Sequence, residues 1–277
     1  MIGFTVTFAI MGTLVRLLSG ELDPLQIAFF RNLFSIFVIV PILFHVGLRA
    51  AIRTSRPGLH LVRSVVSLTA MYCLFIAFAR MPIADATALT FTSPLFATMG
   101  AALVLGEVVR MRRWTATLIG FAGVLIVLRP GVEAIQPAAL IALASALFLA
   151  TTMLLVKTLT RTESPTTMVL YMMLFMTPLS LVPALFVWQW PTPAQWPLLI
   201  AIGVAGTFGQ FMMARAFASA EASAVLPFDF ARLVFTAIMG FTVFGEAPDL
   251  WTWLGGAVIL SATVYIAHRE ARVTRGP

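Results

Sequence analysis

Long hydrophobic stretches alternate with short polar segments over the whole length of the chain. Each stretch has about 20 residues, the length that an α-helix needs to cross the ~30 Å hydrocarbon core of a bilayer. A transmembrane β-barrel would show segments of about ten residues with alternating polarity, so the pattern indicates helices. The predicted spans lie near residues 2–18, 24–46, 59–79, 84–106, 114–129, 137–156, 167–188, 196–218, 222–244 and 250–267.

The basic residues predict how these spans are oriented, because loops rich in Lys and Arg tend to stay in the cytoplasm. One set of loops contains only Arg80 and Arg129 as basic residues, together with the acidic stretches 21–23 and 246–249. The opposite loops and the C-terminal tail contain Arg49, Arg53, Arg56, Arg110, Arg112, Arg113, Lys157, Arg161, Arg269, Arg272 and Arg275. We therefore expect both termini to lie in the cytoplasm.

The composition excludes a water-soluble domain. Hydrophobic residues make up 60% of the 277 residues and charged residues only 10%, whereas soluble domains have about a quarter of their residues charged. The net charge of +7 comes from the basic loops, without the basic stripe that is typical of nucleic-acid binding. The single cysteine, Cys73, excludes an intrachain disulfide framework. Residues 2–18 lack a charged n-region and a cleavage site, so we interpret them as the first span.

The two parts of the sequence resemble each other at a nearly constant offset. Ala77-Phe78-Ala79 matches Ala216-Phe217-Ala218, and Gly106-Glu107 matches Gly245-Glu246, both at a spacing of 139. Such self-similarity predicts a duplication, with halves at residues 1–136 and 137–277. Each half contains five predicted spans, and an odd number places the second copy upside down in the membrane. The expected fold is an all-α polytopic membrane protein of ten helices in two inverted five-helix repeats.

These paired motifs, together with the arginine of Phe30-Arg31-Asn32, resemble the drug/metabolite transporter superfamily of the EamA type. The resemblance covers essentially the whole chain. It implies a central cavity lined by the spans near 59–79, 84–106, 196–218 and 222–244. It also implies export of amino acids or related metabolites, with S-adenosylmethionine, nucleosides and drug-like cations as alternatives.

Ionisable residues inside spans are costly and therefore become functional candidates. Asp229 and Arg232 are three residues apart on one predicted helix face and are close enough to pair. Either they form a structural ion pair, or one of them contacts substrate, or Asp229 cycles protons for coupling. For Arg31 we expect a gating or inter-helix contact rather than substrate contact. Arg16, Arg80 and Arg129 lie near predicted span ends, where we expect their side chains to reach the membrane interface.

Two prolines predict bends, because a proline inside a helix leaves a carbonyl without its usual donor. Pro94 and Pro227 lie in the spans near 84–106 and 222–244, which correspond to each other in the two halves. The neighbouring hydroxyls of Thr90 and Ser93 either bond backbone carbonyls or face a ligand.

The other candidates for substrate contact are aromatic or uncharged polar residues in the remaining cavity-lining spans. Gln210 is the most specific of them, because an uncharged amide deep in a span has both donors and an acceptor to satisfy and so ties helices together or touches substrate. The remaining candidates are Tyr72, Phe75, Phe78, Thr207 and Phe211.

These observations favour a secondary transporter in a bacterial-type inner membrane that works by alternating access. The sequence has no phosphate-binding loop for ATP and no His-Glu-x-x-His metal motif, so we expect neither an enzyme, a metal nor a cofactor. An intramembrane enzyme and a channel are less favoured alternatives. The expected partners are a small-molecule substrate, most simply an aromatic or other apolar amino acid for export, and membrane lipid, without nucleic acid. The protein is expected to be a monomer or a homodimer.

Overall fold

The chain folds into a bundle of α-helices. The computed structural model describes residues 2–46, 54–104, 111–128, 136–159, 162–163, 165–219 and 231–274. The helices in these ranges are α1 (Ile2–Leu18), α2 (Pro24–Phe34), α3 (Ile36–Val46), α5 (Pro57–Arg80), α6 (Ile83–Thr90), α7 (Ser93–Val104), α8 (Met111–Leu128), α9 (Pro137–Leu159), α10 (Pro165–Phe186), α11 (Gln195–Ser219), α13 (Ala231–Phe244) and α14 (Leu250–Thr274). The predicted all-α polytopic fold is confirmed.

Among the residues that the structure describes, five helical stretches are long and apolar enough to cross a membrane. They are Pro24–Pro41, Pro57–Arg80, Pro137–Val156, Thr167–Phe186 and Gln195–Met213. Shorter apolar helices occur at Ile2–Leu18, Trp114–Leu128, Ala231–Phe244 and Leu250–Ala262. Large apolar side chains such as Phe37, Phe186 and Leu250 are exposed on the surface of the bundle, as expected for a protein whose solvent is lipid.

The local sequence explains where several helices begin and break. Asp23 caps α2, since its side chain accepts a hydrogen bond from the Leu25 amide at 2.8 Å, and Pro24 occupies the first turn. The predicted span near 84–106 is divided into α6 and α7 at residues 91–92. The break directly precedes Ser93 and Pro94, because proline has no amide hydrogen to bond the preceding turn.

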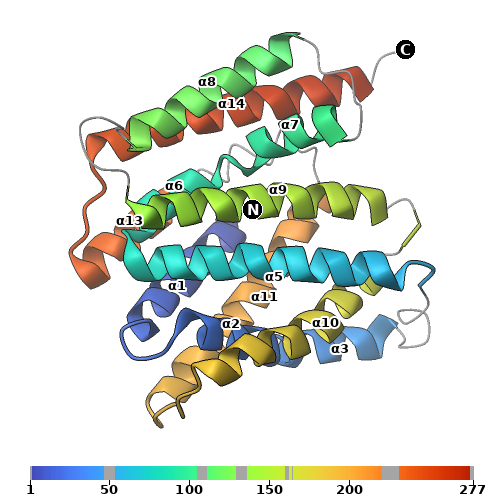
Figure 1. Ribbon diagram of the computed structural model, residues 1–277, viewed down its shortest axis with the longest axis vertical. Coiled ribbons are helices and arrows are strands. Elements are labelled where there is room, and N and C mark those ends of the chain that lie inside the picture. The colour runs from blue at the N-terminus through green and yellow to red at the C-terminus, as the bar shows by residue number, and fades with distance from the viewer. Residues whose placement is uncertain are drawn as a thin grey trace.

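Helices from the two halves of the chain are interleaved. Figure 1 shows α14 lying along α8 at one edge of the bundle and α5 lying along α9 through its middle. Helix α1 packs against α11 and α13, and α2 packs against α10 and α11. Hydrogen bonds reinforce the α5–α9 contact, since Ser145 Oγ donates to the Ala70 carbonyl at 2.8 Å.

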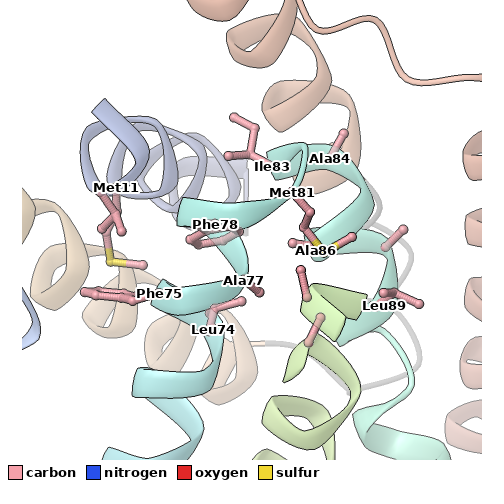
Figure 2. Packing of buried hydrophobic residues seen from close by; sticks show 14 of the residues in the cluster. Met11, Leu74, Phe75, Ala77, Phe78, Met81, Ile83, Ala84, Ala86 and Leu89 are labelled. Carbon is pink, nitrogen blue, oxygen red and sulfur yellow. The ribbon is translucent and has the colours of Figure 1, made fainter. Parts of the chain in front are cut away.

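One part of the hydrophobic core lies where α1, α5 and α6 meet. Phe75 and Phe78 of α5 are fully buried, and Met11 of α1 lies beside them (Figure 2). Gly12 permits this contact, because a Cβ at that position would lie 3.3 Å from the Phe78 ring. The interior side of α5 is therefore fixed against α1 over its last two turns.

Candidate functional site

A group of polar side chains lies between α2, α5 and α10 and has Ser180 at its centre. Asn32 Nδ2 donates to Ser180 Oγ at 3.2 Å, and the Tyr72 hydroxyl donates to the Ser180 carbonyl at 3.4 Å. Arg31 Nη1 in turn donates to Asn32 Oδ1 at 3.0 Å. Ser180 and Asn32 are buried and Tyr72 is half-buried. We call Arg31, Asn32, Tyr72 and Ser180 the polar cluster.

Arg31 places an unused hydrogen-bond donor at the edge of this cluster. Its side chain is only 9% exposed, and its Nε has no hydrogen-bond partner among the described residues. Gly206 of α11 allows the close approach, since a Cβ there would lie 3.0 Å from Arg31 Nε and 3.1 Å from Met11 Sδ. Buried polar atoms without a partner are rare in folded proteins, so this N–H is a strong candidate for ligand contact.

Arg232 lies close to two aromatic rings, those of Phe8 on α1 and Phe91 at the junction of α6 and α7. Its guanidinium carbon is 4.7 Å from the centre of the Phe8 ring and 4.6 Å from that of Phe91. Phe8 also contacts Phe78 edge-on, with the ring centres 6.0 Å apart. The aromatic side chains of α1, α5 and the α6–α7 junction thus form a continuous group that reaches from Arg232 to Phe78.

Three buried arginines lie within the described bundle. Arg31, Arg63 and Arg232 are all buried, and Arg63 Nε and Nη1 have no hydrogen-bond partner in the described residues. Buried guanidinium groups within a membrane protein are expensive and usually mark a functional path. The N–H groups of Arg31 and Arg63 that have no partner among the described residues are able to donate to hydrogen-bond acceptors.

The hydroxyl candidates from the sequence mostly bond their own helices. Thr90 Oγ1 donates to the Thr87 carbonyl at 2.7 Å, and Thr207 Oγ1 donates to the Gly203 carbonyl at 2.9 Å. Ser93 is buried at the start of α7. Thr90 thus makes a backbone bond of the kind named in one of the two alternatives, and its role toward a ligand stays a prediction.

The remaining candidates divide between the interior and the exposed side of the bundle. Phe75 and Phe78 lie in the core, whereas Gln210 and Phe211 of α11 are exposed. Gln210 follows Gly206 by four residues and therefore shares its helix face, so an accessible amide continues the side of α11 that contacts Arg31. Phe211 shares its face with the exposed Val204 and Phe208 and does not join the polar cluster. Asp229 and Pro227 lie outside the described residues.

Sequence reasoning missed the role of Arg16, which it placed at the membrane interface. Arg16 instead forms an ion pair with Glu246, and its Nη1 donates to the carbonyl oxygens of Phe78, at 2.9 Å, and Met81. Glu246 is the acid of the second Gly-Glu motif. Gly245 has a φ of +70°, a conformation that favours glycine, and this turn precedes Glu246. The Gly-Glu motif was the available signal, although nothing in the sequence named its partner.

A second group of ionisable residues lies near the start of α5. Glu163 Oε1 accepts hydrogen bonds from Thr54 Oγ1 at 2.9 Å and from the Ser55 amide at 3.1 Å, and Glu163 Oε2 lies 3.8 Å from His60 Nε2. Burial by itself raises the pKa of the Glu163 carboxyl, but the hydrogen bonds from Thr54 and Ser55 and the nearby His60 outweigh it and hold that pKa below its ordinary value. In the part of the chain that the structure describes, no group of three His, Cys, Asp or Glu side chains is placed to bind a metal.

Comparison with known proteins agrees with this architecture. A riboflavin transporter of Vibrio cholerae is 38% identical over 274 residues, which cover 98% of this chain and 92% of the relative. An S-adenosylmethionine uptake transporter of Rickettsia prowazekii is 30% identical over 267 residues, covering 96% and 90%. A crystal structure of another protein has a TM-score of 0.64 over 99% of this chain and 98% of that one, and its 19% identity shows the fold alone. The EamA-like transporter family matches residues 1–129 and 136–267. The chain therefore belongs to the EamA-like transporter family.

Proposed function

We propose that this protein transports a riboflavin-like substrate across the bacterial inner membrane by alternating access. Membership of the EamA-like family makes it a multi-pass small-molecule transporter, and the substrate and the mechanism are what we add. The proposed working units are the two inverted halves, residues 1–136 and 137–277. The two separate family matches, at 1–129 and 136–267, support this division. Inverted repeats provide two related conformations, each open to one side of the membrane.

The observation on which the substrate proposal depends is the Arg31 Nε–H, an unused donor in the polar cluster close to buried aromatic residues. Riboflavin has a flat heteroaromatic ring with carbonyl acceptors and a hydroxylated chain. Aromatic walls with a few placed polar groups suit such a compound. Arg31 and Tyr72 offer donors, and the exposed amide of Gln210 can both donate and accept.

The name of the Vibrio relative supports the same substrate class, and that of the Rickettsia relative points to a similar one. S-adenosylmethionine also joins a heteroaromatic ring to a hydroxylated sugar. Its positive charge, however, is disfavoured by the buried cations Arg31 and Arg63. Export of an aromatic amino acid, as predicted from the sequence, stays a prediction. The names of these relatives favour a substrate with a heteroaromatic ring over an amino acid.

Uptake by the purified protein in liposomes tests the proposal directly. Radiolabelled riboflavin, S-adenosylmethionine and phenylalanine are supplied in parallel, with and without an imposed pH gradient. We expect saturable riboflavin uptake that unlabelled riboflavin inhibits and phenylalanine does not. If S-adenosylmethionine or phenylalanine is transported and riboflavin is not, the transported compound replaces riboflavin as the proposed substrate. A requirement for the pH gradient would support proton coupling, for which Asp229 is the candidate.

Three variants connect this activity to the site. Tyr72→Ala and Gln210→Ala are expected to reduce riboflavin uptake at least tenfold. Phe186→Ala serves as the control, because Phe186 is 86% exposed on the surface of the bundle. Normal uptake by both site variants, at equal amounts of inserted protein, would remove Tyr72 and Gln210 from the site.

A further inference from the structure

Arg16 joins three parts of the bundle at the end where α1 and α5 finish. Its guanidinium bonds the carbonyl oxygens of Phe78 and Met81, pairs with Glu246, and lies 5.5 Å from the centre of the Phe244 ring. Phe78 and Met81 belong to the first half of the chain, and Glu246 and Phe244 to the second. A single side chain therefore ties the two proposed moving units together.

Other contacts between the halves gather at the same end of the bundle. Gln195 Nε2 donates to a Glu21 carboxylate oxygen. The backbone N–H of Gln189 donates to Gln26 Oε1 at 3.0 Å. Thr252 Oγ1 also donates to Asp85 Oδ1 at 2.8 Å. These contacts close the end that the charge distribution predicts to face outward, which we call the outer end. At the opposite end, the hydrogen bonds of Glu163 with Thr54 and Ser55 also join the halves.

We propose that the Arg16–Glu246 ion pair is the gate of the outer end, closed in this conformation and separated when the transporter opens to that side. This inference rests on the proposed alternating access. It names the residues whose contact must break in each cycle. The binding site of the polar cluster is not part of the gate.

The burial of the pair suits a contact that opens and closes repeatedly. The side chains of Arg16 and Glu246 are 22% and 20% exposed. A fully exposed ion pair contributes little and would not keep the end closed. Separating a deeply buried pair would leave uncompensated charges at high cost. A partly exposed pair lies between these limits, because water can solvate both groups as they separate.

The position of the cation recurs in the second half of the sequence. Arg16 precedes Pro24 by eight residues, and Lys157 precedes Pro165 by eight residues. Both prolines begin a helix, α2 and α10. In an inverted repeat, Lys157 belongs to the opposite end of the bundle, which makes it a matched control for Arg16.

A cysteine placed just inside the gate tests the proposal without any substrate. Thr13 is buried on α1, three residues before Arg16 and on the same helix face. The reporter protein contains Thr13→Cys and Cys73→Ser, so that one thiol remains. Its rate of labelling by a membrane-impermeant maleimide is measured in intact cells and in inverted vesicles. Arg16→Gln and Glu246→Gln are each added to the reporter, with Arg80→Gln and Lys157→Gln as controls.

We expect Glu246→Gln and Arg16→Gln to raise labelling from the outer side about tenfold, with no further increase in the double variant. The charge-reversed pair Arg16→Glu/Glu246→Arg is expected to restore slow labelling. Arg80→Gln should leave the rate unchanged, because Arg80 is exposed at the same end. Lys157→Gln should not raise labelling from the outer side.

Three results would overturn the proposal. They are unchanged labelling in both single variants, an equal rise from both sides of the membrane, and an equal rise in Arg80→Gln. Equal labelling of all variants after denaturation checks that each protein is present and its thiol is intact. The gate proposal and the substrate proposal fail separately, because the labelling assay contains no substrate.

Discussion

The guanidinium carbon of Arg232 lies 4.6 Å from the centre of the Phe91 ring, directly at the junction between α6 and α7. The opposite neighbour is Phe8 of α1, at 4.7 Å. A cation that is buried in this way is stabilised by the negative faces of both rings. The contact joins α13 of the second half to two helices of the first, at the place where a predicted span is interrupted.

Phe91→Leu is expected to lower the free energy of unfolding by about 1–3 kcal/mol. Leucine keeps most of the apolar volume but removes one of the two cation–π contacts, each worth ~0.5–2 kcal/mol, and leaves a small void. Thermal unfolding in detergent measures the change. Phe186→Leu is the matched control, because it alters an exposed phenylalanine. Equal effects of the two substitutions would show that the Arg232 contact contributes nothing.

The glycines of α11 predict two different results for the same substitution. A Cβ at Gly203 would lie 2.6 Å from Phe34 Cβ and 3.1 Å from the Arg31 carbonyl oxygen, which are parts of α2 that cannot move independently. Gly203→Ala is therefore expected to cost about 1–3 kcal/mol of stability through overpacking. A Cβ at Gly206 would instead meet the side-chain atoms Arg31 Nε and Met11 Sδ, at 3.0 and 3.1 Å.

Gly206→Ala should accordingly fold with near-normal stability but displace the Arg31 guanidinium by a few tenths of an ångström. We expect its KM for riboflavin uptake to rise several-fold with little change in the amount of inserted protein. Thermal unfolding and uptake kinetics on both variants separate the two effects. A Gly206→Ala protein as unstable as Gly203→Ala would contradict the packing described for Arg31.

The Glu163 contacts predict a loss of stability in acid. The pKa of Glu163 is depressed in the folded protein, so its carboxylate stabilises the fold at pH values above the ordinary glutamate pKa. This contribution is lost as the pH falls through the lower, folded-state value. We expect Glu163→Gln to be less stable than the parent at pH 7 by ~1–2 kcal/mol, since it weakens charge-assisted hydrogen bonds from Thr54 and Ser55. The difference should shrink below about pH 4.

Thermal unfolding of both proteins between pH 3.5 and 8 checks this sign. If the difference in stability between the two proteins stays constant across this pH range, the ionised Glu163 carboxylate is not the cause of that difference. Thr162→Ala, which alters the exposed residue beside Glu163, is the control for general effects on the segment.

The helical architecture was predictable because span length and hydrophobicity follow directly from bilayer thickness. The break before Pro94 was predictable for an equally local reason, because proline has no amide hydrogen to donate. The partner of Arg16 was not, because Glu246 is 230 residues away and the contact depends on how the halves pack. The outward position of Phe211 also depends on the rotation of α11 against its neighbours. A hydrophobic sequence leaves this rotation undetermined, because lipid-facing and interior positions are both apolar.

Substitution of Arg31 is expected to weaken riboflavin binding while leaving the free energy of unfolding nearly unchanged. Its Nε–H has no partner in the described structure, and burying a cation costs free energy unless it is paired. Arg31→Gln removes that charge, so its stability should stay within ~1 kcal/mol of the parent despite the lost bond to Asn32. Riboflavin affinity, measured by quenching of flavin fluorescence, should fall at least tenfold if the Nε–H donates to the ligand.

Arg31→Lys distinguishes a directed hydrogen bond from simple charge. Lysine keeps the positive charge but lacks the planar guanidinium and its Nε–H. We expect Arg31→Lys to bind riboflavin as weakly as Arg31→Gln, because a neutral acceptor responds to a placed donor more than to a distant charge. Parent-like affinity in Arg31→Lys would show that charge alone suffices. Unchanged affinity in both variants would place Arg31 outside the site and leave its role in the packing of α2 against α11.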